Sequence, residues 1–156
     1  MRLTDFITPE FISLGLDVRS KNDLLEKMLT LISSNQSVTD KTKLRFDVLK
    51  REKDAPTGIG NGVALPHAKT KAVTAPVVAL SILSKPIDYG SSDNEPVKIV
   101  FLLAVPENLA ILHLKFLSQI AKTVQQPEMR LRLSSAQSIE DILFILTEKE
   151  KVLPEF

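Results

Sequence analysis

Hydrophobic residues near the start of the chain recur at helical spacing. Ser20 suits the N-cap of a helix that ends near Asn35, and Asp23 falls in its positive first turn. The apolar positions that share one face of this helix are Leu24, Leu25, Met28, Leu31 and Ile32. This spacing predicts an amphipathic helix that packs against a core.

A second helix is predicted to begin at Thr39 or Asp40. Its inward positions are Leu44, Val48 and Leu49, and the charged residues 50–54 form its last turns. Pro56 ends the helix, because the residue before a proline is driven out of the helical conformation.

Two short apolar runs in the middle of the chain predict buried strands. They cover residues 77–83 and 97–105, are rich in Val, Ile and Leu, and are bounded by Pro or turn residues. Between them, residues 88–96 have the composition of a turn or short loop.

Helical spacing returns in the last third, over residues 109–124, 127–135 and 139–147. Ser138 and Asp141 resemble a capping pair for the last of these helices. No internal repeat or long linker divides the chain. Helical and strand-like patterns therefore predict an α/β fold, with residues 1–156 forming a single domain.

Composition narrows the class of protein. The 156 residues carry a net charge of +1 and no basic stripe with interleaved aromatic residues, so a nucleic-acid partner is not expected. The absence of cysteine excludes disulfides, thiolate metal sites and a cysteine nucleophile. No signal-like start and no apolar run of about 20 residues is present, so we expect no membrane insertion and a cytoplasmic protein.

The segment TGIGNGVALPHAKT, residues 57–70, is the strongest candidate for a functional site. Gly58, Gly60 and Gly62 could let the main chain form a cradle for an anion, but they fit a simple turn between helix and strand equally well. The dinucleotide fingerprint needs a third glycine at the position that Val63 occupies. Ala68 likewise stands where a P-loop needs glycine. The glycines alone are therefore a weak phosphate signal.

His67, one of only two histidines, lies near the end of this segment, directly after Pro66. Pro66 restricts Leu65 to extended geometry, so residues 63–65 are predicted to form a short strand that presents His67. A neutral imidazole has a free lone pair that can attack phosphorus, and it leaves readily when the group moves on. The alternative is a histidine that simply forms a hydrogen bond at a strand end.

His113 lies on the apolar face of its predicted helix, together with Phe116, Leu117, Ile120 and Val124. That pattern is usual for a buried packing residue. However, the helix follows the end of a predicted strand, where ligand sites of α/β sheets lie, so the two histidines could meet. His113 could then donate an N–H to a phosphoryl oxygen or orient His67. A metal role is weaker, because the two histidines lack a third ligand at a characteristic spacing, and Glu107 is the only obvious carboxylate nearby.

Four separated stretches together resemble a known family. They are residues 57–70, KRE at 50–52, KIVFLLAVPEN at 98–108, and the helix that holds His113. In type, order and distance they are similar to the fructose- and mannitol-type enzyme IIA (EIIA) domains of the bacterial sugar phosphotransferase system, and particularly to stand-alone nitrogen-type enzyme IIA. The resemblance covers nearly the whole chain. It implies a mixed central β-sheet flanked by helices on both faces.

The resemblance also implies roles for three side chains. His67 accepts phosphate from the histidine-containing phosphocarrier protein, His113 is its partner histidine, and Arg51 is the arginine of the RE pair. A guanidinium suits this role because it binds phosphoryl oxygens with two donors, although Arg51 alone also fits a solvated charge at a helix end. The family requires no metal or other cofactor for the transfer.

The missing cysteine limits the next step of the relay. The EIIB acceptors of the fructose and mannitol branches use a cysteine, so the acceptor must be a separate EIIB or a regulatory protein that responds to the phosphorylation state. The chain is accordingly expected to be a phosphotransferase component with a covalent phosphohistidine. The alternative is a regulatory binding module of the same fold without phosphotransfer.

Two residues depart from the family pattern, and three others are expected around the site. Pro56 replaces a small hydroxyl residue before the glycine segment, and Asn61 stands where mannitol-type members can carry an acid. Both affect the details of the loop. Ile59, Val63 and Leu109 are candidates for an apolar rim on which the donor docks, although each also fits a core position.

Overall fold

The computed structural model describes residues 2–152. Two short 3-10 turns, Leu3–Phe6 and Pro9–Phe11, lead into the first strand. The strands are β1 (Ile12–Leu16), β2 (Gly58–Gly60), β3 (Val63–Ala64), β4 (His67–Thr70), β5 (Val77–Ile87) and β6 (Val97–Pro106). The helices are α1 (Lys21–Ser33), α2 (Lys41–Asp54), α3 (Ala110–Gln125), α4 (Pro127–Ser134) and α5 (Ile139–Glu150).

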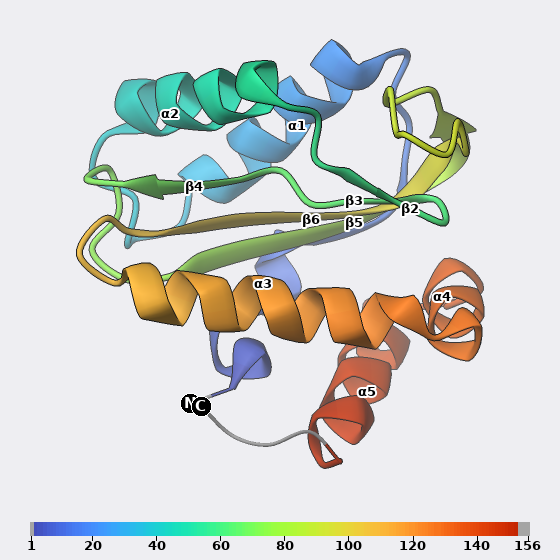
Figure 1. Ribbon diagram of the computed structural model, residues 1–156. Coiled ribbons are helices and arrows are strands. Elements are labelled where there is room, and N and C mark those ends of the chain that lie inside the picture. The colour runs from blue at the N-terminus through green and yellow to red at the C-terminus, as the bar shows by residue number, and fades with distance from the viewer. Residues whose placement is uncertain (1, 153–156) are drawn as a thin grey trace.

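The six strands form one mixed sheet in the order β1-β5-β6-β3-β2. Strand β4 pairs with β6 on the same edge as β3, nearer the carboxyl end of β6. Strands β5 and β6 are antiparallel, whereas β3 and β4 run parallel to β6. Helices α1 and α2 cover one face of the sheet, and α3, α4 and α5 cover the other (Figure 1). The predicted fold class, a mixed sheet flanked by helices on both faces, is confirmed.

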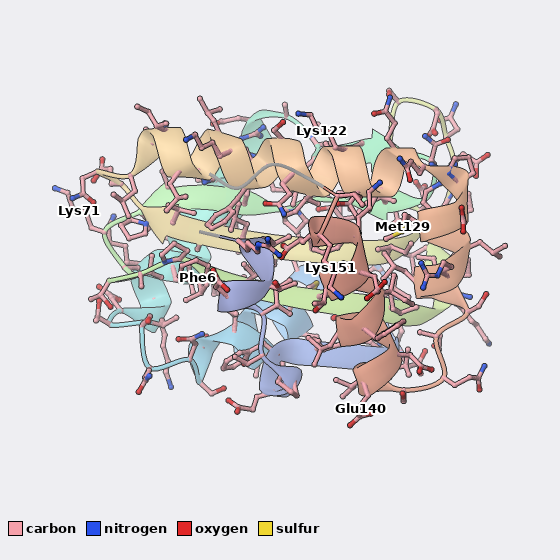
Figure 2. The ribbon with its side chains drawn as sticks, turned by 90° about the horizontal axis from the view of Figure 1, so that it is seen from below. Phe6, Lys71, Lys122, Met129, Glu140 and Lys151 are labelled. Atoms are coloured by element: carbon pink, nitrogen blue, oxygen red, sulfur yellow. The ribbon has the colours of Figure 1, made fainter. Side chains whose placement is uncertain are left out.

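Residues 77–83 of β5 and nearly all of β6 are buried on both faces of the sheet, because each face has its own core. Leu102 and Ala104 belong to the core under α1 and α2, whereas Phe101 and Leu103 belong to the core under α3. Figure 2, viewed from the α3 side, shows α5 lying next to α3 across the second face. The continuous apolar runs in the sequence follow from this arrangement, since both faces exclude water.

Helix starts follow the predicted caps closely. Ser20 Oγ accepts from Asp23 N at 3.1 Å, Asp40 Oδ1 accepts from Lys43 N at 3.0 Å, and Ser138 Oγ accepts from Asp141 N at 3.1 Å. In α1, Leu29 is buried although it was not predicted, whereas Leu31 is only half-buried. Within residues 2–152, no helix is both long and apolar enough to cross a bilayer.

Three strands were not predicted, and each is short. Strand β1 carries Gly15 at a φ of +77° and a register shift, so no regular alternation of its side chains signals a strand. Strands β2 and β4 lie within the segment that was predicted to be a glycine loop followed by a site residue. Strand β4 determines where the candidate site forms.

Candidate functional site

Strand β4 holds His67 at an edge of the sheet. His67 lies opposite Leu103 of β6, and Leu103 N donates to Pro66 O at 3.0 Å, which fixes the main chain just before the imidazole. Among the described strands only β6 pairs with β4, and its other edge is free. The histidine is therefore built into a rigid strand while its side chain stays half-exposed.

The His67 ring is held in one tautomer by a single hydrogen bond. Its Nδ1 lies 2.7 Å from Leu65 O. A carbonyl oxygen can only accept, so Nδ1 carries the proton and Nε2 keeps its lone pair. Burial lowers the pKa of His67; the Leu65 carbonyl opposes this shift, the Arg51 charge adds to it, and the Glu52 charge again opposes it. The neutral imidazole, with Nε2 as a nucleophile, is thus favoured at neutral pH.

His113, in the first turn of α3, faces His67. The two ring centroids are 5.3 Å apart and the ring planes are inclined by 50°. His113 is only 4% exposed, and its Nδ1 is buried without a hydrogen-bond partner within the described part of the chain. Burial first, and then the charges of His67, Lys69 and Arg51, lower the pKa of His113 to about 4. The His113 ring is therefore neutral near pH 7.

Arg51 lies in the last turn of α2, where its Nη1 donates to Ala55 O at 2.9 Å. It lines an open cavity of about 270 Å³ together with His67 and His113. The other residues that line the cavity are Asp47, Lys50, Asp54, Ala68 and Lys69. The fold thus brings together the three side chains that the sequence singled out, from α2, β4 and α3.

A buried polar network next to the cavity was missed by the sequence analysis. Glu52 is 5% exposed and accepts from Thr57 N and Thr57 Oγ1, each at 2.9 Å, while Lys21 Nζ lies 3.3 Å from it. Tyr89 OH lies 3.1 Å from Thr57 Oγ1, and because the Thr57 proton goes to Glu52, Tyr89 is the donor. Burial and the Glu52 charge raise the pKa of Tyr89, so it keeps its proton.

This network fixes the chain where it leaves α2. Lys21 comes from α1, Glu52 from α2, and Tyr89 from the loop after β5. Thr57 also accepts from Leu65 N at 2.9 Å, which ties the network to the residue whose carbonyl orients His67. No local pattern marked Glu52 as buried, because a charged residue at a helix end is usually solvated.

The three glycines do not line the cavity with His67. Asn61 and Gly62 have φ values of 57° and 79°, as the two-residue turn of a tight hairpin requires, and they connect β2 to β3. Val63 lies opposite Ile99 and His67 opposite Leu103, so the turn is at least four residues further back along β6, about 13 Å. The structure therefore gives these glycines a place in the hairpin, away from His67.

Close packing explains Gly58. A Cβ at this position would lie 2.1 Å from Ser91 Oγ, so only glycine lets β2 approach the loop between β5 and β6. Of the expected rim residues, Ile59 and Leu109 are exposed, but Val63 is fully buried and belongs to the core. Pro56 is exposed, next to the buried Thr57.

No group of three or more His, Asp or Glu side chains able to hold a metal ion occurs within residues 2–152.

Lys69, which sequence analysis did not select, lies two residues after His67 on the same strand and lines the same cavity. Its spacing was the available signal, since alternate residues of a strand share a face.

Comparisons with known proteins find a family model and several relatives that match most of this chain. A family model described as "Phosphoenolpyruvate-dependent sugar phosphotransferase system, EIIA 2" matches residues 5–149. The fructose-specific EIIABC component of the phosphotransferase system of Bacillus subtilis is 31% identical over 97% of this chain, which spans only 24% of that protein. A nitrogen regulatory protein of Pseudomonas aeruginosa is 32% identical over 95% of this chain and 96% of its own length.

A solved structure shares the fold. The crystal structure of nitrogen regulatory protein IIA-Ntr from Neisseria meningitidis matches with a TM-score of 0.87 and 30% sequence identity. The match covers 92% of this chain and 98% of that one. The arrangement of strands and helices around the cavity is therefore a shared architecture.

Proposed function

This chain belongs to the EIIA type-2 family of the phosphoenolpyruvate-dependent sugar phosphotransferase system, and we propose that it carries a phosphoryl group on His67. The observation that supports this most is the hydrogen bond from His67 Nδ1 to Leu65 O, because it leaves Nε2 unprotonated at the edge of an open cavity. We extend the proposal to residues 1–156 as one EIIA domain in the cytoplasm.

The proposed reaction is a transfer between two imidazoles. The lone pair of His67 Nε2 attacks phosphorus, the new P–N bond forms, and the donor imidazole leaves with the electrons of the old P–N bond. His67 keeps the proton on Nδ1, so no base is needed to activate it. The Leu65 carbonyl stabilises the developing positive charge on the ring, because it accepts from the N–H that becomes more acidic.

The neighbouring side chains suit the product. Arg51 is permanently charged, and its remaining N–H groups can bind two phosphoryl oxygens. His113 is neutral and its Nδ1 is sealed in the core, so Nε2 is the ring atom available to the cavity. We assign it to donate Nε2–H to a phosphoryl oxygen or to orient the His67 ring. No metal or other cofactor takes part in these steps.

The proposed donor is the histidine-containing phosphocarrier protein. Residues 1–156 have no cysteine, so the cysteine acceptor of a fructose- or mannitol-type EIIB does not lie among them. The proposed next step is transfer to a separate EIIB; alternatively, the phosphoryl group stays on His67 as a signal to which a regulatory protein responds. The fructose and nitrogen-regulatory relatives differ by one percentage point of identity, 31% against 32%, so identity favours neither role.

Phosphorylation in vitro tests the proposal. The chain is incubated with phosphoenolpyruvate, enzyme I and the phosphocarrier protein, and its intact mass is measured before and after mild acid. We expect one acid-labile phosphate on the wild type and on His113→Gln, and none on His67→Gln. With only two histidines in the chain, phosphate that persists in His67→Gln but disappears in His113→Gln would move the site to His113.

The alternative function is a regulatory binding module without phosphotransfer. It predicts no gain of phosphate by the wild type while the donor in the same tube is fully phosphorylated. The onward step separates the roles of His113: we expect His113→Gln to accept phosphate but to retain it or pass it on at an altered rate. A transfer rate equal to that of the wild type would reduce His113 to a packing residue.

A further inference from the structure

Lys69 presents its side chain on the same side of β4 as His67. Ala68 and Thr70, the alternate residues, are buried, and Thr70 Oγ1 donates to Asp47 Oδ2 of α2 at 2.6 Å. Because side chains alternate along a strand, His67 and Lys69 point away from that packed side. Lys69 is exposed, yet it lines the cavity that contains His67 and Arg51.

The Lys69 ammonium has no carboxylate partner among residues 2–152. By contrast, Lys71 Nζ lies 4.0 Å from Glu107, and Lys43 Nζ lies 3.3 Å from Asp47. Lys50, which lines the cavity from α2, also has no carboxylate partner among these residues. Lys69 nevertheless acts on the site, since its charge is one of the causes that lower the pKa of His113. It is a cation held beside the acceptor histidine without a counter-ion of its own.

The main chain of β4 adds to this arrangement. Pro66 O accepts from Leu103 N at 3.0 Å and Thr70 O accepts from Glu107 N at 3.2 Å, so alternate residues of β4 bond to β6. In a parallel pair the residues between them direct their N–H and C=O groups to the other side. The amides of His67 and Lys69 therefore face the free edge of the strand, next to the cavity.

We propose that Lys69 is a second phosphoryl-binding residue, which holds the phosphoryl group on His67 from the β4 side while Arg51 holds it from α2. This inference rests on the proposed function. Lys69 exchanges no proton in the transfer. Its ammonium attracts the phosphoryl dianion, so it stabilises the phosphorylated state of this chain relative to that of the donor and lowers the pKa of the phosphoryl group itself.

The expected effect is moderate, because an exposed ammonium is partly screened by water and salt. At low ionic strength, Lys69→Gln should reduce the equilibrium constant for transfer onto His67 by roughly three- to fivefold. Lys69→Arg keeps the charge, so its equilibrium constant for transfer should be close to that of the wild type. Raising the salt concentration to about 1 M, where the screening length is about 3 Å, should shrink the difference between wild type and Lys69→Gln.

Lys71→Gln is the matched control. Lys71 follows Lys69 by two residues, is also exposed to solvent, pairs with Glu107, and points away from the body of the molecule (Figure 2). It does not line the His67 cavity. Its removal should leave the equilibrium constant for transfer unchanged within twofold.

The experiment measures the transfer equilibrium and the bound phosphoryl group separately. Each variant is mixed with phosphorylated phosphocarrier protein, and the phosphorylated fraction of both proteins is read by intact mass. Each is also phosphorylated with phosphoramidate, a small donor that needs no docking surface, and the phosphohistidine is titrated by ³¹P NMR. Support requires a lower equilibrium constant and a higher phosphoryl pKa in Lys69→Gln, with both restored in Lys69→Arg.

Several results would overturn the inference. One is an unchanged equilibrium constant together with an unchanged ³¹P titration in Lys69→Gln. Another is a Lys69→Gln variant whose only change is a slower reaction with the protein donor, because Lys69 would then be a docking residue. If wild type accepts phosphate and Lys69→Gln equals it, only this inference fails. If wild type accepts none on His67, the proposed function fails and this inference with it.

Discussion

The ring centroids of His67 and His113 lie 5.3 Å apart, although His67 belongs to β4, which precedes β6 in the sequence, and His113 belongs to α3, which follows it. Neither residue is a strong signal by itself. Together they form a pair in which one ring is oriented by a carbonyl and the other is neutral and nearly sealed from water. The pairing converts two isolated histidines into a site.

Loss of Arg51 should weaken phosphorylation. Hydrogen bonds to charged groups contribute about 1.5–3 kcal/mol, so Arg51→Ala should lower the equilibrium constant for phosphoryl acceptance by roughly ten- to a hundredfold. Arg51→Lys keeps the charge but loses the two-donor geometry, so its equilibrium constant should lie between those of the wild type and Arg51→Ala. Intact-mass measurement of the phosphorylated fraction checks this. The control is Arg45→Ala on the same helix, which pairs with Glu26 at 2.6 Å and lies outside the cavity; equal effects of both variants would contradict the assignment.

Stability should fall as the pH is lowered through the window between about 6.5 and 4. His113 has a pKa of about 4 in the folded protein and about 6.5 when unfolded, so the unfolded state binds more protons in this window. The free energy of unfolding therefore rises with pH, and His113 should account for a loss of roughly 2 kcal/mol between pH 7 and pH 5. Urea denaturation at both pH values checks this.

The matched comparison is His113→Gln, which cannot titrate. Its loss of stability between pH 7 and pH 5 should be smaller than that of wild type, while the carboxylates contribute equally to both proteins. Identical losses would show that His113 is not held neutral by its surroundings.

Gly58→Ala should destabilise the protein without altering the proposed phosphoryl site. The added Cβ would lie 2.1 Å from Ser91 Oγ and 2.9 Å from Ser91 Cβ, so the hairpin or the loop must shift, at a cost of about 1–3 kcal/mol. The double variant Gly58→Ala, Ser91→Gly removes both contacts and should recover much of that loss in urea denaturation.

Phosphoryl acceptance per folded molecule should be unchanged in both Gly58 variants, because the hairpin lies away from His67. A specific loss of acceptance in folded Gly58→Ala would instead restore the glycines to the phosphate site that the sequence suggested.

Thr57→Val should lower the free energy of unfolding by about 1–3 kcal/mol. The substitution removes the hydroxyl that donates to Glu52 and accepts from Tyr89, so two buried polar groups lose a partner. Thr74→Val is the control, since its exposed hydroxyl makes only a long 3.4 Å contact with Ser37 O. Equal urea midpoints for the two variants would mean that the network contributes little to stability.

Much of the fold could be predicted because helix signals are local. Ser20, Asp40 and Ser138 cap their helices as their side-chain chemistry indicates, and the apolar runs of β5 and β6 are long enough to identify. The hairpin at Asn61 and Gly62 was not predicted, although Asn-Gly is a strong signal for a two-residue turn. Strands β1 and β4 were not predicted either, because a strand of four or five residues owes its place to its partner.

The sequence by itself determined the kinds of elements, their caps, the glycine-rich segment and the choice of His67 as the residue to explain. Only the tertiary structure decided that Arg51 and His113 reach His67, that Lys69 shares their cavity, and that Glu52 is buried. The physical reason is that periodicity and capping act within a few residues, whereas the site depends on the pairing of β4 with β6 and on the packing of α2 and α3 against opposite faces of one sheet.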